Sequence, residues 1–152
     1  MKWLVALLSC VTCTPAFTAT ETASGPGYTV RNFFTSALED TLPVDRVDIV
    51  QAGAQVVMYT TYASLPDEEQ THVGKLFDAY GTLVHTYEHT FDPCGGTKRV
   101  WQWFTPPVTA PTGMWTFEVW LNGEKVLANA IFVGGALPSK EAPAEEVRKG
   151  EL

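Results

Sequence analysis

The dipeptide Asn122-Gly123 constrains the fold of this chain more than any other feature of the sequence. It lies between two runs, 114–121 and 124–133, that are rich in apolar, aromatic and β-branched residues. Asn and Gly both tolerate the positive φ of a type I′ turn, whose twist matches that of two antiparallel strands. The sequence therefore predicts a β-hairpin at this point.

The first strand of this hairpin shows which side chains face the core, because alternate residues of a strand point to opposite faces. One face would carry only Trp115, Phe117, Val119 and Leu121, and the other Thr116, Glu118 and Trp120. A shift of one residue would bury Glu118, so we expect the apolar face to be held firmly in the core. We also expect Phe33, Val57 and Tyr59 to be core residues.

Five further segments have the same β-branched and aromatic character, and turns that contain Pro or Gly separate several of them. These segments are residues 28–38, 55–65, 72–78, 82–91 and 98–104. Strands at such short spacing predict an all-β fold, an immunoglobulin-like antiparallel β-sandwich of about seven strands. Residues 28–134 would form this one domain in a chain of 152 residues.

The N-terminus has the pattern of a secretory signal peptide, residues 1–16. Lys2 precedes an apolar run that is too short for a bilayer, which needs about 20 apolar residues, and small residues follow up to Ala16. Residues 17–27 would be a linker, and the protein periplasmic or secreted. A lipid anchor on Cys10 at the envelope is one alternative. The ER lumen is another, because the last four residues, 149–152, resemble a retrieval signal.

Residues 135–152 are rich in charge, Ala and Pro, and we expect a flexible tail there. The formal net charge of −7 disfavours nucleic acid, which binds mainly through Lys and Arg. The sequence predicts no integral membrane span. Cleavage of the signal would leave Cys94 as the sole cysteine. The residues around it are typical of a turn, and we expect its thiol to be buried or inert in a loop and not reactive.

Residues 85–89 read His-Thr-Tyr-Glu-His, which matches the H-x-x-E-H motif of a family of zinc proteases. On a helix, residues four apart share a face at about 6 Å, and two imidazoles can bind one ion. On a strand the same two residues lie about 13 Å apart. The surrounding residues are strand formers, so we expect no catalytic residues and no cofactor, with a zinc hydrolase at His85, Glu88 and His89 as an alternative. A calcium ion at Asp67, Glu68 and Glu69 is the alternative to a solvated acidic turn.

Three tryptophans are candidates for ligand binding: Trp101, Trp103 and Trp120. Alternate residues of the run 98–104 face opposite sides. Either Trp101 and Trp103 face the core, or Gln102 and its alternate neighbours face it. Burying Gln102 without a partner costs about 1–3 kcal/mol, whereas burying two Trp is favourable by several kcal/mol. We therefore predict that Trp101 and Trp103 face the core. If they faced outward, they would form a flat platform for sugar rings. Of the three tryptophans, Trp120 is the one that we expect to be most exposed.

Several elements of the body resemble a family of short bacterial exported immunoglobulin-like domains of unknown function. They are Phe33-Phe34-Thr35, Pro43-Val44, Gln70-Thr71-His72, the Trp-rich run 100–104, and the hairpin 113–133 with its core Trp. In these relatives a His-Arg-Trp stretch commonly follows the Gln-Thr pair, whereas here residues 72–77 read His-Val-Gly-Lys-Leu-Phe, so any function of that stretch is not implied. The resemblance implies the fold and supplies no catalytic residues.

These observations predict an exported, noncatalytic immunoglobulin-like domain that acts as a binding or accessory module of the cell envelope. Its partner would be a protein or an envelope polysaccharide. A carbohydrate-binding module that uses a Trp platform is the first alternative, and the zinc hydrolase is the second.

Overall fold

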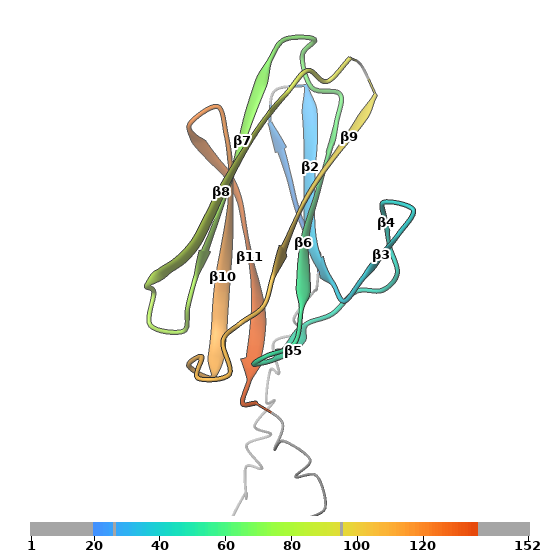
Figure 1. Ribbon diagram of the computed structural model, residues 1–152. Helices are drawn as coiled ribbons and strands as arrows, with labels where there is room; N and C mark the ends of the chain where they lie inside the picture. Colours follow the sequence, from blue (N-terminus) through green and yellow to red (C-terminus); the bar gives the residue numbers. More distant parts are fainter. Residues whose placement is uncertain (1–19, 26, 95, 137–152) are drawn as a thin grey trace, which may run out of the picture.

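The computed structural model describes residues 20–136 except 26 and 95, and all of its regular elements are strands (Figure 1). The expected signal peptide, Cys10, Cys13, most of the expected tail and the last four residues lie outside the described residues. Among those described, no helix has the length and hydrophobicity needed to cross a membrane.

All seven predicted strands are confirmed, with small changes of their ends. They are β2 (Tyr28–Thr35), β6 (Val56–Ala63), β7 (Gln70–Phe77), β8 (Leu83–Phe91), β9 (Thr97–Phe104), β10 (Gly113–Leu121) and β11 (Glu124–Gly134). Four short strands were not predicted: β1 (Thr20–Gly25), β3 (Leu38–Glu39), β4 (Leu42–Pro43) and β5 (Ile49–Gln51). Strand β1 lies within residues 17–27, so the expectation of a linker is wrong for that part, which pairs with β2.

The strands form two layers (Figure 1). One sheet has the order β1-β2-β6-β9, and the other has the order β5-β11-β10-β7-β8. Strand β6 pairs with β9 in the first sheet, while β7 pairs with β10 in the second, so the chain crosses between the layers repeatedly. This is the connectivity of an immunoglobulin-like sandwich, and the predicted fold class is confirmed. All pairs are antiparallel except β5 with β11.

The β10–β11 hairpin has the predicted turn and the predicted inner face. Asn122 has a φ of 50° and Gly123 a φ of 85°, as a type I′ turn requires. The Asn122 side chain also accepts a hydrogen bond from the backbone N of Thr71 at 2.9 Å, which ties the turn to β7. All four predicted core side chains are at most 5% exposed: Trp115, Phe117, Val119 and Leu121.

Phe33, Val57 and Tyr59 are buried, as predicted, but they lie outside the core cluster between the two sheets. They point to the outer side of the four-stranded sheet. Their sequence neighbours Phe34 and Met58 point the other way, into the core cluster between the two sheets. The segment that contains the β3–β4 hairpin covers them. The Tyr59 hydroxyl donates to the carbonyl of Thr41 at 3.1 Å, and the Arg46 guanidinium lies 4.7 Å above the Phe33 ring.

Candidate functional site

Strand β9 faces the opposite way from the prediction. Val100 is 4% exposed and belongs to the core, Phe104 packs against that core, and Trp103 is 38% exposed on the outer side. The reason lies at Gln102. It faces inward, but it is only half-buried, and its amide nitrogen donates to the carbonyl of Trp103 at 3.1 Å. The cost that argued against burying Gln102 is therefore not incurred, and the prediction of Trp101 and Trp103 in the core is wrong.

Trp101 and Trp103 lie two residues apart on the same face, about 7 Å from one another along the strand. The Trp101 ring stacks on that of Tyr59, with centroids 6.2 Å apart and an interplanar angle of 14°. Tyr59 in turn packs against Phe33 at 5.2 Å. Because β9 is the last strand of its sheet, no further strand of that sheet lies beyond Trp101. One side of this ring is held by the sheet, and the other borders the sheet edge.

Trp120 lies on the outer face of the other sheet and contacts charged side chains there. The Lys75 ammonium lies 4.0 Å above its ring, and its indole nitrogen donates to Glu118 Oε2 at 3.0 Å. Glu118 Oε1 forms an ion pair with Lys125 at 3.1 Å. The structure therefore brings Trp101 and Trp103 together and leaves Trp120 on the other sheet. Trp120 is half-buried with a cation over its ring, whereas Trp103 is exposed, so the expectation that Trp120 is the better exposed candidate is wrong.

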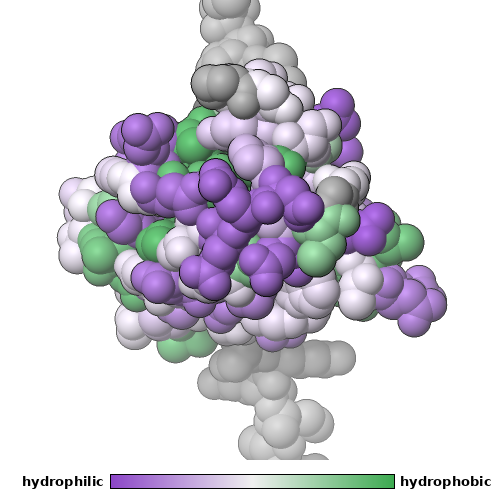
Figure 2. Space-filling model, turned by 90° about the horizontal axis from the view of Figure 1, so that it is seen from above, coloured by the Kyte–Doolittle hydropathy of each residue, from purple (hydrophilic) through white to green (hydrophobic). Residues whose placement is uncertain are grey.

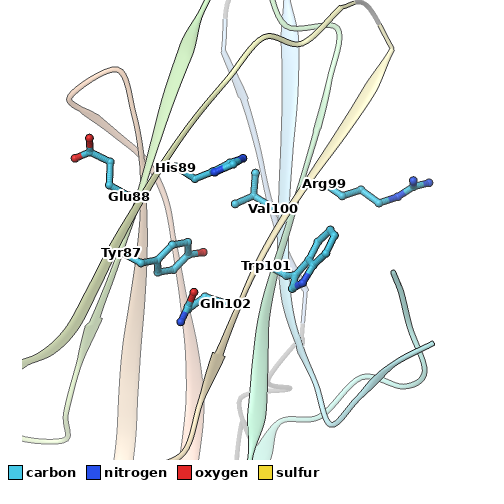
Figure 3. A pocket seen from close by; sticks show the side chains of 7 residues that line it. All are labelled: Tyr87, Glu88, His89, Arg99, Val100, Trp101 and Gln102. Carbon is cyan, nitrogen blue, oxygen red and sulfur yellow. The ribbon is translucent and has the colours of Figure 1, made fainter. Parts of the chain in front are cut away.

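A cleft of about 290 Å³ lies between β8 and β9, which are the terminal strands of the two sheets. Its lining residues are Tyr87, Glu88, His89, Arg99, Val100, Trp101 and Gln102 (Figure 3). Tyr87, His89 and Gln102 point into the space between the two strands, whereas Trp101 and Arg99 extend to the far side of β9 (Figure 3). The two faces of β9 thus border different surfaces: the cleft on one side and the Trp pair on the other.

A buried polar network lies behind this cleft. His72 is fully buried, its Nδ1 is 2.5 Å from the Tyr62 hydroxyl, and its Nε2 is 3.0 Å from the Tyr87 hydroxyl. Burial, with a smaller contribution from the charge of His89, lowers the pKa of His72 to about 4. Burial also raises the pKa values of Tyr62 and Tyr87. All three groups are therefore neutral near pH 7, and both ring nitrogens of His72 are occupied, so the network holds β6, β7 and β8 together.

The H-x-x-E-H segment is extended, as predicted, within β8. His85 and His89 lie on its inner face about 13 Å apart, while Glu88 lies on the opposite, exposed face. The three side chains do not converge on one point. His89 pairs across the strands with His72, whose nitrogens bind Tyr62 and Tyr87.

The acidic residues Asp67, Glu68 and Glu69 are exposed in the β6–β7 connection. Seen from this end, hydrophilic side chains gather across the middle of the molecule, with more apolar ones around them (Figure 2). Within residues 20–136, leaving aside 26 and 95, no three His, Cys, Asp or Glu side chains are grouped as they are around a metal ion. Cys94 is exposed in the β8–β9 turn with a φ of 52°.

The sequence reasoning missed two features of the outer face, Arg99 and the role of Tyr59. Arg99 has the same parity as Trp101 and Trp103, so it shares their face whichever way the strand is turned. That signal was present in the sequence. The support that Tyr59 gives to Trp101 depends on the pairing of β6 with β9, which no local pattern specifies.

No protein-family model matches this chain, and no curated protein matches it in sequence. Among solved structures, it is similar to a β-glucosidase from Listeria innocua in complex with glucose, with a TM-score of 0.49 and 13% identity over 73% of this chain and 16% of that one. The alkylpurine DNA glycosylase AlkC of Pseudomonas fluorescens gives a TM-score of 0.45 and 12% identity over 58% of this chain and 28% of that one.

An immunoglobulin-like protein, PA1606 of Pseudomonas aeruginosa, gives a TM-score of 0.41 and 14% identity over 78% of this chain and 98% of that one. The chain thus spans far less than two thirds of the two enzymes and nearly the whole of the immunoglobulin-like protein. All three TM-scores are below 0.5, so the fold described above rests on the strand order and pairing.

Proposed function

We propose that this protein is a noncatalytic binding module of the cell envelope, exported to the periplasm or the cell exterior, that binds polysaccharide through Trp101 and Trp103. The secretory pattern of residues 1–16 and the resemblance to exported immunoglobulin-like domains support export. The fold by itself does not specify a function, so the argument for binding depends on the site.

The outward orientation of Trp101 and Trp103 is the observation that carries the proposal. Trp103 keeps 38% of its surface exposed, although a large aromatic ring gains free energy by leaving water. The apolar C–H face of a sugar ring packs well on an indole, while the sugar hydroxyls remain available for hydrogen bonds. Because Tyr59 already holds the Trp101 ring in place, little side-chain entropy would be lost when a ligand binds.

The titratable groups near the cleft support a noncatalytic role. A general acid or base works best when its pKa lies near the working pH. Burial moves the pKa of His72 to about 4 and raises that of Tyr87, so both are moved away from pH 7. His85 and Glu88 lie on opposite faces of β8 and cannot act together on one bond.

Retention of the purified protein on immobilised polysaccharides tests the proposal. The double variant Trp101→Ala/Trp103→Ala should lose about tenfold or more in affinity, because two stacking contacts of about 1 kcal/mol each are removed. Trp120→Ala is the matched control, since it removes a tryptophan from the other outer face, and it should bind as the wild type does. Far-UV circular dichroism checks that each variant is folded. Equal retention of the double variant and the wild type would overturn the proposal.

A further inference from the structure

We propose that the polysaccharide bound on this face is anionic, and that Arg31 and Arg99 recognise its carboxylate or phosphate groups beside the Trp pair. This inference rests on the proposed function and names the class of its ligand. It comes from the charges on the outer face of the four-stranded sheet, which differ from those of the chain as a whole.

The chain has 17 acidic and 10 basic residues, yet in its described part none of the acidic residues lies on the outward rows of this sheet. Directly opposite residues of paired strands share a face, so the register identifies these rows. They consist of Thr22 and Ser24 of β1; Thr29, Arg31, Phe33 and Thr35 of β2; Val57, Tyr59, Thr61 and Ala63 of β6; and Thr97, Arg99, Trp101 and Trp103 of β9. Phe33, Thr35, Val57 and Tyr59 are buried, so hydroxyl groups, two tryptophans and two arginines make up most of the accessible part of this face.

Arg31 and Arg99 lie in one row across the sheet, on either side of Thr61. Two strand spacings put their Cα atoms about 10 Å apart. Both are exposed, and neither makes an ion pair with a carboxylate in the part of the chain that the structure describes. The next row of the same face contains Trp101, so a ligand stacked on that ring passes directly beside Arg99.

A hollow of about 310 Å³ adjoins Arg31, and Arg99 lies beside it, because it is paired with Thr61 of its lining. It is lined by Thr29, Arg31, Thr61, Ala63 and Thr97. Threonine hydroxyls can donate to and accept from sugar hydroxyls, while a guanidinium binds a carboxylate or a phosphate with two parallel hydrogen bonds. This combination suits a polymer that carries both kinds of group, and it contains nothing that would repel an anion.

Acidic and basic residues lie at different places along this face. The exposed acids Glu39 and Asp40 lie on the β3–β4 hairpin, whose Thr41 carbonyl binds Tyr59. Asp45 follows the hairpin, and hydrogen bonds from Ser36 and Thr35 lower its pKa, so it stays charged. The anionic groups of a ligand should therefore lie toward Arg31 and Arg99, away from the hairpin.

The test compares polygalacturonate with its methyl-esterified form, which has the same backbone without the charge, and adds a glycerol-phosphate polymer as a second anion. The wild type should bind at least one of the two anionic polymers about tenfold more tightly than the ester, and less tightly as salt rises from about 50 to 500 mM. Arg31→Gln/Arg99→Gln should remove this preference and leave binding of the ester unchanged. Lys75→Gln/Lys125→Gln makes the same change of charge on the other outer face and should keep it.

Equal binding of charged and neutral polymers, lost in Trp101→Ala/Trp103→Ala, would overturn this inference and leave the proposed function standing. No binding to any of the three polymers would overturn both. Binding to phosphatidylglycerol vesicles without binding to either anionic polymer would also overturn the inference, because the anion would then be a lipid headgroup. Unchanged preference in the double arginine variant, with its fold confirmed by circular dichroism, would show that other groups select the charge.

Discussion

Strands β9 and β10 each carry two tryptophans, but they use them differently. In β10, Trp115 and Trp120 are five residues apart and point to opposite faces, so one is 2% exposed in the core and the other lies outside. In β9, Trp101 and Trp103 are two residues apart and share a face, and that face is the outer one. Spacing decides whether two residues of a strand share a face, whereas the surroundings decide which face is inside.

The two outward-facing groups of tryptophans also differ in their contacts. Trp120 interacts with charged side chains of the protein, whereas Trp101 and Trp103 leave surface open to a ligand. Trp120 has a cation over its ring and a carboxylate on its nitrogen, so its polar and π interactions are supplied by the protein. Trp103 remains 38% exposed, and its neighbour Trp101 lies next to Arg99, which makes no ion pair in the described part. A tryptophan on an outer face is therefore a candidate for binding only when its neighbours leave it unoccupied.

The largest effect on stability is expected inside the sandwich. Trp115→Ala should lower the free energy of unfolding by about 3–5 kcal/mol, because it empties a core position and removes the hydrogen bond from its indole nitrogen to the Pro111 carbonyl. Urea denaturation measures the change, with Trp103→Ala as the surface control. A loss below about 1 kcal/mol would contradict the description of this face as core.

A pH titration extends the comparison to the polar part of the inner face. The pKa of His72 is about 4 in the folded protein and near 6.5 when unfolded, so between these values the unfolded chain binds a proton that the folded one does not. Protonation of His72 in the unfolded chain therefore lowers the free energy of unfolding as pH falls from 6.5 toward 4. The expected loss over this range is about 3 kcal/mol, and above pH 6.5 there is none. Urea midpoints measured across this range should show the loss, and His72→Phe should remove most of it. An unchanged pH dependence in that variant would assign the loss to other groups.

The interaction over Trp120 should contribute less. Lys75→Met keeps the apolar stem and removes the ammonium above the ring, so the expected loss is about 0.5–1 kcal/mol. Lys125→Met, which removes the exposed partner of Glu118, should cost less than about 0.5 kcal/mol. If the Lys125 variant proved the more costly, the ion pair rather than the ring contact would be what holds this face together.

The smallest effect on stability is expected at Trp103, although its effect on fluorescence should be large. Trp103→Phe should change the free energy of unfolding by about 0.5 kcal/mol or less, since the side chain is 38% exposed. It should also remove the tryptophan signal that acrylamide quenches most readily, whereas Trp115→Phe should leave that signal in place. Quenching that does not fall in the Trp103 variant would place this ring in a covered position.

The successes and failures of sequence reasoning follow from what each residue depends on. The β10–β11 hairpin was predictable because the turn residues and the alternation specify the same register. The orientation of β9 was not predictable, because each of its faces carries two apolar residues and the choice rested on an assumed cost for Gln102. The cover over Tyr59 was also missed, because the two-residue strands β3 and β4 are too short to show a period.

The sequence by itself determined where the chain is extended, where it turns at Asn122-Gly123, and that Arg99, Trp101 and Trp103 share one face. These properties depend on local backbone preferences and on the two-residue period of a strand. Only the tertiary structure decided that this face is the outer one. Gln102 lies where the terminal strands β8 and β9 of the two sheets separate, so it stays half-buried with a backbone partner, and the core is filled by Val100 and Phe104.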